Sequence, residues 1–240
     1  MPTKTATTSY LPAVSDEIIA ALDTAASNTS LTVKSQFQRA FATATAIGQL
    51  KALLTPEVMK PILSLQNSAL GFMTDRKDGY PLDTVRECLI DAVLSGVSPV
   101  GNEFNIISSR AYITKNGMKH KLRDVPELNS FSPTPGIPKM VGDKGAIVDF
   151  TLDWNHAGKP GRQTLTIPVR VNAGMGADAI IGKATRKAYA WLFEHITGQA
   201  VNEGDATDNA SPVIEAKISA IDSEPAKTEP APAETGDLPM

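Results

Sequence analysis

The most constraining feature of this chain is an apolar stripe between Asp178 and Thr197. Its members recur three and four residues apart, the spacing of one buried helical face. They are Ile180, Ile181, Ala184, Ala188, Trp191, Leu192 and Ile196. Gly174 and Gly176 interrupt the chain before the stripe, and Gly198 suits a helix end. We therefore predict one long helix that must pack its apolar side on another element.

Two alternating segments precede this helix and predict its partner. Apolar residues alternate over 146–154 and again over 163–171, and the polar stretch 155–162 lies between them as a hairpin tip. Such a pair forms an antiparallel hairpin with one apolar face, and the long helix is the obvious cover for that face. Pro168 predicts an edge strand because proline cannot donate a hydrogen bond to a neighbouring strand.

Shorter elements are predicted before the hairpin. Strands are expected at 104–107 and 110–115, with Asn116-Gly117 as a turn. Residues 118–123 form either a third strand or a short basic helix, and the spacing of Met118 and Leu122 favours the helix. The proline-rich stretch 126–138 predicts a loop or an irregular edge.

The N-terminal third reads as helical. Helices are expected from Ser15 or Asp16, from about Leu31 to Leu54, and from Pro56. Phe37 and Phe41 belong to the apolar side of the second of these helices. Further on, Thr84 and Glu87 stand three residues apart and predict a capping box, for a helix that Gly96 and Pro99 end.

Together these patterns predict an α+β fold with three regions. Residues 1–80 are a helical region for self-association or simple packing, and residues 81–200 are the α+β core. Residues 201–240 are rich in Ala, Pro, Glu and Asp and lack aromatics, so they predict a disordered acidic tail.

Length and composition exclude several classes of protein. A chain of 240 residues with 42% hydrophobic content can bury a real core in one large domain or two small ones. The single cysteine, Cys88, excludes an internal disulfide framework and fits a reducing compartment. The sequence shows neither an apolar run of about 18 residues nor a secretory signal, so we expect a cytoplasmic protein without a membrane span.

The net charge of −3 conceals an uneven distribution of charge along the chain. Residues 105–190 hold 13 Lys and Arg against 6 Asp and Glu, a net of +7. Residues 191–240 hold 2 against 10, a net of −8. This pattern predicts a binding site for a polyanion in the middle of the chain, and a tail that could compete for it.

No constellation of catalytic or metal-binding residues stands out. The three histidines, His120, His156 and His195, lack the spacing of a metal site, and the chain has no nucleophile elbow. The segment 174–179 imitates a dinucleotide fingerprint, and 176–183 imitates a phosphate-binding loop with one residue too many. A nucleotide-dependent enzyme thus stays as a minor alternative; we expect no catalytic residue, metal or cofactor.

The remaining signal is a set of cations with an aromatic among them. Single-stranded nucleic acid is bound by a positive groove along its backbone and by stacking of bases on aromatic rings. The candidate DNA-binding residues are Arg110, Tyr112, Lys115, Lys119, Lys121, Arg123, Lys159, Arg162, Lys183, Arg186 and Lys187. An ordinary solvated charged face is the alternative for the three cations of the long helix. If those cations bind DNA, replacing Lys183 and Lys187 by alanine should weaken binding and leave folding intact.

Residues 82–200 resemble the RecT/Redβ-type phage single-strand annealing proteins. The resemblance starts at Thr84–Pro99, TVRECLIDAVLSGVSP, which is similar to the helix of that family ending in Gly-Leu-x-Pro. Gly101–Ile107 and Ala111–Gly117 follow, similar to the strand pair of the family before a short helix. The hairpin and the basic helix come in the same order. The chain departs from the family at Ile113–Gly117, where an aromatic-rich Gly-Tyr-Lys-Gly segment is absent.

This resemblance implies annealing of complementary DNA strands without ATP hydrolysis. It also implies rings or filaments of one chain joined through N-terminal helices, with DNA in a basic groove between hairpin and helix. A phage exonuclease and a host single-strand-binding protein are further partners that it suggests, in the cytoplasm of a host cell. A phage structural or assembly module that binds protein with its sheet is the alternative from another class.

Overall fold

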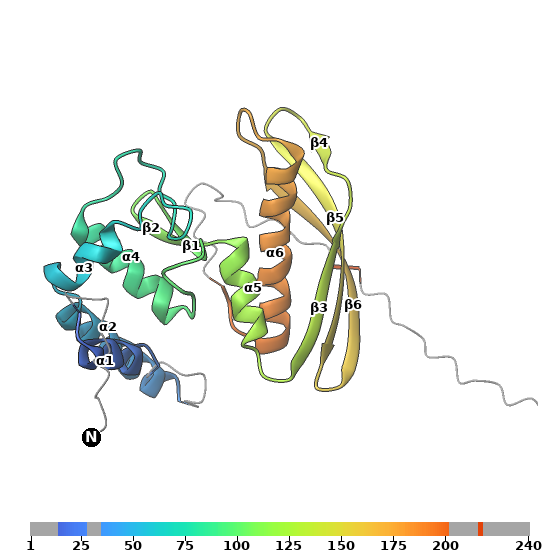
Figure 1. Ribbon diagram of the computed structural model, residues 1–240. Coiled ribbons are helices and arrows are strands. Elements are labelled where there is room, and N and C mark those ends of the chain that lie inside the picture. The colour runs from blue at the N-terminus through green and yellow to red at the C-terminus, as the bar shows by residue number, and fades with distance from the viewer. Residues whose placement is uncertain (1–13, 28–34, 202–215, 218–240) are drawn as a thin grey trace, which may run out of the picture.

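The computed structural model describes residues 14–27, 35–201 and 216–217. Four helices and a two-stranded sheet lie on one side, two further helices lie in the middle, and a larger sheet closes the other side (Figure 1). The fold is therefore α+β, as predicted.

The N-terminal third is helical, with α1 at Asp16–Ser27, α2 at Gln36–Leu53 and α3 at Pro56–Leu63. Thr55 caps α3, because its side chain accepts the N–H of Val58. The apolar side predicted for α2 is wrong in part. Phe37 and Phe41 are 78% and 72% exposed, because α1 and α4 pack on other faces of that helix.

Helix α4 spans Leu82–Leu94, and its predicted capping box is wrong. Pro81 occupies the N-cap position, so Thr84 lies inside the helix rather than at its start. The chain is fixed one turn earlier by Tyr80, whose backbone N–H donates to the side chain of Gln66 at 2.7 Å. The predicted end of this helix at Gly96 is confirmed to within two residues.

Strands β1, Phe104–Ile107, and β2, Arg110–Ile113, form the small antiparallel sheet. Helix α5 follows directly at Lys115–Arg123, which confirms the preferred alternative for that segment. The turn predicted at Asn116-Gly117 is wrong, because both residues belong to the first turn of α5.

The larger sheet contains the predicted hairpin. Strand β5, Gly145–His156, pairs along its length with β6, Lys159–Arg170. Only Ala157 and Gly158 separate the strands, both with positive φ, so the hairpin tip is shorter than predicted. At Pro168 the outer side of β6 pairs with no strand among the described residues, as the proline predicts.

Residues 126–138 were expected to form a loop or an irregular edge. The loop is wrong, since β3 spans Leu128–Pro135 and pairs with β5. Within the described chain β3 pairs with β5 alone, and its register shifts between Leu128 and Ser130, so the alternative of an irregular edge holds. Its prolines are tolerated because an edge strand leaves every second N–H without a strand partner. The short strand β4, Lys139–Val141, pairs with the start of β5.

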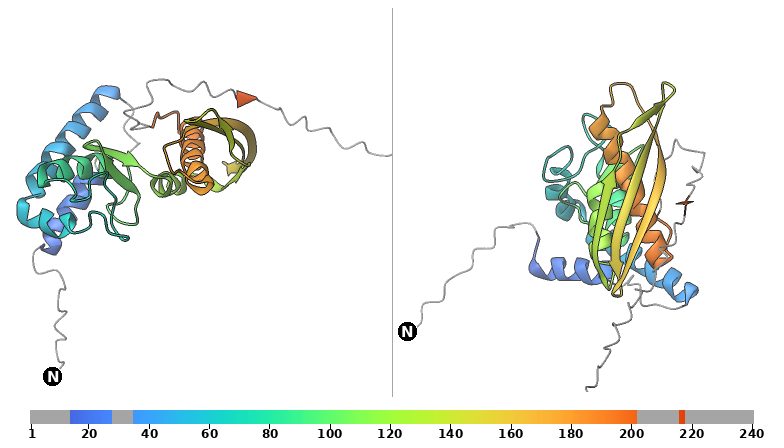
Figure 2. Two further views of the ribbon diagram at one scale, coloured as in Figure 1. Left: turned by 90° about the horizontal axis from the view of Figure 1, so that it is seen from above. Right: turned by 90° about the vertical axis from the view of Figure 1, so that its right-hand side faces the viewer.

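Helix α6, Ala177–Thr197, lies against the hairpin, and the sheet curves around it when seen from above (Figure 2). Ala184, Ala188 and Leu192 are fully buried opposite the alternating apolar residues of β5 and β6. Gly198 ends the helix in the left-handed conformation with φ 67°. The predicted long helix and its position over the hairpin are both confirmed.

The apolar core is one cluster that crosses residue 80, because α2 and α3 contact α4. The division into 1–80 and 81–200 as functional regions stays a prediction. The predicted disordered tail lies outside the described residues, except for Val201 and for the two-residue strand β7, Ala216–Lys217, which pairs with β6. Within the described ranges, no helix is long and apolar enough to cross a membrane.

Candidate nucleic-acid interface

Helix α5 presents a line of three exposed cations. Lys115, Lys119 and Arg123 follow one another at intervals of four residues, so they share one side of the helix. Eight residues of helix place the first and last of them about 12 Å apart along the axis. The opposite side of α5, with Met118 and Leu122, is fully buried. We call Lys115, Lys119 and Arg123 the α5 stripe.

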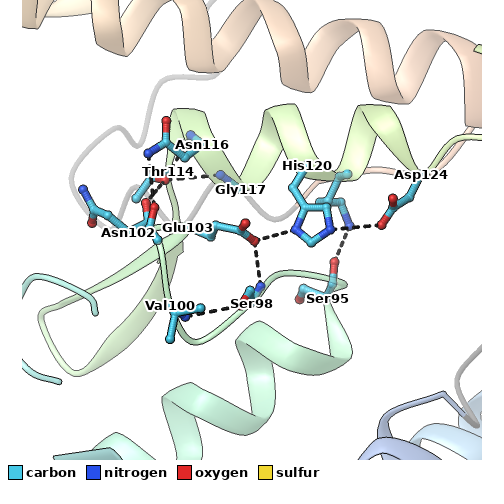
Figure 3. Close-up of polar contacts among 12 residues, drawn as sticks. Ser95, Ser98, Val100, Asn102, Glu103, Thr114, Asn116, Gly117, His120 and Asp124 are labelled. Atoms are coloured by element: carbon cyan, nitrogen blue, oxygen red, sulfur yellow. Dashed lines mark hydrogen bonds and ion pairs between the residues drawn. The ribbon is translucent and has the colours of Figure 1, made fainter. Parts of the chain in front are cut away.

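The start of α5 is fixed by a cap and by a close backbone approach (Figure 3). The Thr114 hydroxyl accepts the N–H groups of Asn116 and Gly117, at 3.2 and 3.4 Å, and donates to the Asn102 carbonyl at 2.6 Å. A Cβ at Gly117 would lie 2.2 Å from the carbonyl oxygen of Glu103. Glycine is therefore required where the helix meets the loop before β1.

The middle of α5 is held by two carboxylates. Nδ1 of His120 lies 2.6 Å from Oε2 of Glu103, and Nε2 lies 3.3 Å from Oδ2 of Asp124 (Figure 3). The same Glu103 oxygen accepts the backbone N–H of Ser98 at 2.7 Å. Through Glu103 the imidazole thus links α5 to the 98–103 loop.

Lys121 does not belong to the α5 stripe. Its ammonium group donates to the carbonyl of Ser95 at the end of α4 and lies 4.6 Å from the ring centroid of Phe193. Burial lowers the pKa of this ammonium group below its ordinary value. Lys121 was predicted to contact DNA, and the structure instead gives it a packing role between α4, α5 and α6.

The cationic face predicted for α6 is wrong for two of its three members. Arg186 and Lys187 are only 2% and 7% exposed. The guanidinium carbon of Arg186 lies 4.4 Å from the ring centroid of Tyr112, so two predicted DNA contacts touch each other. The reason is that α6 packs on the sheet at one side and on α5 at the other, which leaves no broad solvent face.

The lysines of α6 approach the outer edge of β6. Lys187 donates to the carbonyl of Pro168 at 3.2 Å, and the half-buried Lys183 donates to the carbonyl of Arg170 at 3.3 Å. Both carbonyls belong to alternate residues on the side of β6 that faces away from β5. The two ammonium groups thus donate hydrogen bonds to β6 carbonyls that are not paired with any described strand.

Three other predicted residues lie elsewhere. Arg110 is exposed on β2, and Lys159 is exposed beside the hairpin turn. Arg162 is also exposed, and its Nε lies 3.5 Å from Oδ1 of Asp153. An exposed ion pair of this kind contributes at most about 1 kcal/mol, so Arg162 is readily released to another anion.

The hairpin turn lies at the same end of the molecule as the C-terminal end of α5 (Figure 1). The N–H of Ala157 in the turn donates to the carbonyl of Glu127 at 3.0 Å, four residues beyond Arg123. The structure therefore brings the C-terminal end of α5, where Arg123 lies, near the hairpin turn, and it gives Arg186, Lys187 and Lys183 contacts within the fold.

The context of the two glycine-based nucleotide motifs differs from the one they need. Gly174 has φ 78° and Gly176 precedes α6, so the segment does open a helix. The preceding strand β6 is antiparallel to β5, and no parallel strand–helix–strand unit occurs in the described ranges. Nor do the described residues contain a group of three metal-ligating side chains.

Sequence reasoning missed the contacts that position α5. Glu103 gave no signal, since it lies 17 residues from His120 and only the fold joins them. Gly117 did give a signal, but the Asn-Gly pair predicts a turn, whereas the structure shows a close contact between helix and loop.

Comparison with known proteins adds no relative: neither a protein-family model nor a curated protein nor a solved structure matches the chain.

Proposed function

We propose that this protein binds single-stranded DNA and anneals complementary strands without ATP. The observation that carries the proposal is the α5 stripe. Three exposed cations stand in line on a short helix whose other side is fully buried. A line of cations suits the regular phosphates of a nucleic-acid backbone better than it suits a single small anion.

The support of α5 strengthens this proposal. The helix is capped by Thr114, tied through His120 and packed on α6, so the stripe is held before any ligand arrives. Because the helix that carries the cations is already ordered, little backbone entropy is lost when a ligand binds. Contacts to phosphates alone leave the pairing edges of the bases free, which annealing requires.

An annealing assay with two complementary labelled oligonucleotides in ATP-free buffer tests the proposal. We expect the protein to accelerate duplex formation and to bind one strand alone with an affinity that falls as salt rises. Each neutralised phosphate contributes about −0.7 to the slope of log K against log salt for a single strand. Absent binding, or binding that salt does not change, would refute the proposal.

A second candidate, a protein-binding assembly module, is favoured by one observation. Phe37 and Phe41 lie four residues apart on α2 and are mostly exposed. Exposed large apolar side chains at helical spacing are typical of a surface that another protein covers. This candidate predicts stable self-association without any acceleration of annealing, and light scattering combined with the annealing assay separates the two.

A further inference from the structure

Both tryptophans of the chain meet at one place, together with a histidine. Trp154 on β5 and Trp191 on α6 have ring centroids 6.1 Å apart at an angle of 66°. His195 stacks on Trp191 at 4.8 Å with an angle of 9°, and its ring lies 5.6 Å from Trp154 at 73°. We call these three residues the aromatic corner, since two parallel rings meet a third that is steeply inclined to them.

The aromatic corner lies where the core between α6 and the hairpin ends. Leu152 and Leu192, next to it in the core, are fully buried. Trp154 and Trp191 are only half-buried, and His195 is exposed. Because α6 ends two residues beyond His195, the corner lies at the same end of the molecule as the hairpin turn (Figure 1).

Gly161 leaves the space that the indole of Trp154 occupies. It is the register partner of Trp154 on β6, and a Cβ there would lie 2.2 Å from Cε2 of the indole. The indole of Trp154 thus lies across the backbone of β6 in space that any other residue would occupy. Such a ring is restrained before a ligand binds, which reduces the entropy lost on stacking.

A histidine and a lysine lie near the corner. His156 and Lys159 are register partners next to the turn, and they share the sheet face of Trp154 because alternate residues of a strand point to the same side. The nearest acidic residue along α6 is Glu194, whose carboxylate accepts the backbone N–H of Val201 at 2.8 Å and is held there. Aromatic faces beside an exposed lysine are the chemistry that binds a base and its phosphate together.

We propose that the aromatic corner stacks a base of the bound single strand, with Lys159 beside it for the phosphate. This inference rests on the proposed function and adds the place where a base, rather than the backbone, is bound. Stacking uses the flat face of a base and leaves its pairing edge exposed. A base held at the corner can therefore still pair with a complementary strand.

Intrinsic fluorescence tests this inference, because the only two tryptophans report on the corner alone. The full-length protein is titrated with a labelled oligo(dT) and with an abasic oligonucleotide of equal length. Binding is followed by the anisotropy of the label and stacking by the tryptophan emission. We expect both strands to bind through their phosphates, and only oligo(dT) to quench the emission.

The outcomes separate this inference from the proposed function. Binding of oligo(dT) without quenching, or equal quenching by the abasic strand, overturns the aromatic corner and leaves annealing intact. Binding of neither strand overturns both. If the aromatic corner binds a protein partner instead of a base, oligo(dT) should bind without quenching the tryptophan emission.

Variants supply a second readout. His195→Ala removes the exposed member, and Trp191→Ala removes a half-buried one. Loss of the stacking contact with one base is expected to weaken oligo(dT) binding by about five- to a hundredfold, with little change for the abasic strand. Trp191→Phe keeps a ring and should retain most of the affinity. An equal loss for both strands in His195→Ala would contradict base stacking.

Discussion

The guanidinium of Arg186 lies 4.4 Å from the ring centroid of Tyr112, and only 2% of the arginine is exposed. The pair joins α6 to the small sheet across 74 residues of sequence. A guanidinium that is stacked and buried in this way stabilises the fold both through the cation–π attraction and through the packing of its side chain. Arg186 thus changes from a predicted DNA contact to a residue that positions α6.

Replacing Arg186 by alanine is expected to lower the free energy of unfolding by about 1–3 kcal/mol, because a desolvated cation–π contact and buried packing are lost. Urea unfolding measures the change. Lys115→Ala, at an exposed site, should stay within about 0.5 kcal/mol and is the control. Lys187 is also buried, so the double change of Lys183 and Lys187 should destabilise the fold, contrary to the sequence-based expectation.

Removing the α5 stripe is expected to weaken DNA binding without unfolding the protein. The triple change of Lys115, Lys119 and Arg123 to alanine removes three phosphate contacts, so the log–log salt slope should become shallower by about 2. Fluorescence anisotropy across a salt series measures it. The matched control changes three exposed lysines elsewhere, Lys60, Lys77 and Lys144. Equal effects of both triples would mean that only net charge matters.

Gly117→Ala is expected to destabilise the protein by about 2 kcal/mol or more, although alanine favours helices. A Cβ at this position would lie 2.2 Å from the backbone oxygen of Glu103, which cannot move without shifting the loop. Gly48→Ala on α2 has open space around its Cβ and should stabilise by up to about 1 kcal/mol. If both variants were stabilised in thermal or urea unfolding, the contact between α5 and the loop would be looser than it is here.

Cys88 is expected to make stability fall at high pH. Burial, with smaller contributions from Asp91 and Glu87, raises the pKa of its thiol to about 11. A raised folded-state pKa adds stability that is complete below the ordinary pKa of about 8.5 and is lost as pH rises through 11. The loss between about pH 9 and 11 should reach up to about 3 kcal/mol.

Cys88→Ala should lack this part of the pH dependence. Lysines and tyrosines titrate in the same range, so the comparison is the difference between the two proteins in urea unfolding at each pH. Parallel pH profiles would show that the thiol is not responsible. The native thiol should also react slowly with iodoacetamide at pH 8, because little of it is ionised.

Phe37 and Phe41 are expected to drive self-association if α2 is a contact surface between copies. Their joint change to serine should shift a concentration-dependent assembly toward smaller species, because exposed apolar area is lost. Analytical ultracentrifugation measures the shift. Ile137→Ser, at a similarly exposed apolar residue in the loop between β3 and β4, is the control. No shift in the double variant would exclude this face of α2.

The sequence by itself determined the elements of this protein wherever local periodicity was strong. The stripe of α6 and the alternation of β5 and β6 arise from hydrogen bonds between near neighbours and from one apolar side, and both can be read without a fold. Gly198 likewise marks a helix end through its own backbone freedom.

Only the tertiary structure decided which sides of those elements face water. Arg186 is buried against Tyr112 of β2 and Lys187 against the edge of β6, while Lys115 and Lys119 of α5 stay exposed. Trp154 and Trp191 were predicted as ordinary apolar positions, and only the packing of α6 on the hairpin brings them together beside Gly161. Burial depends on segments far apart in sequence, and periodicity within one segment carries no information about them.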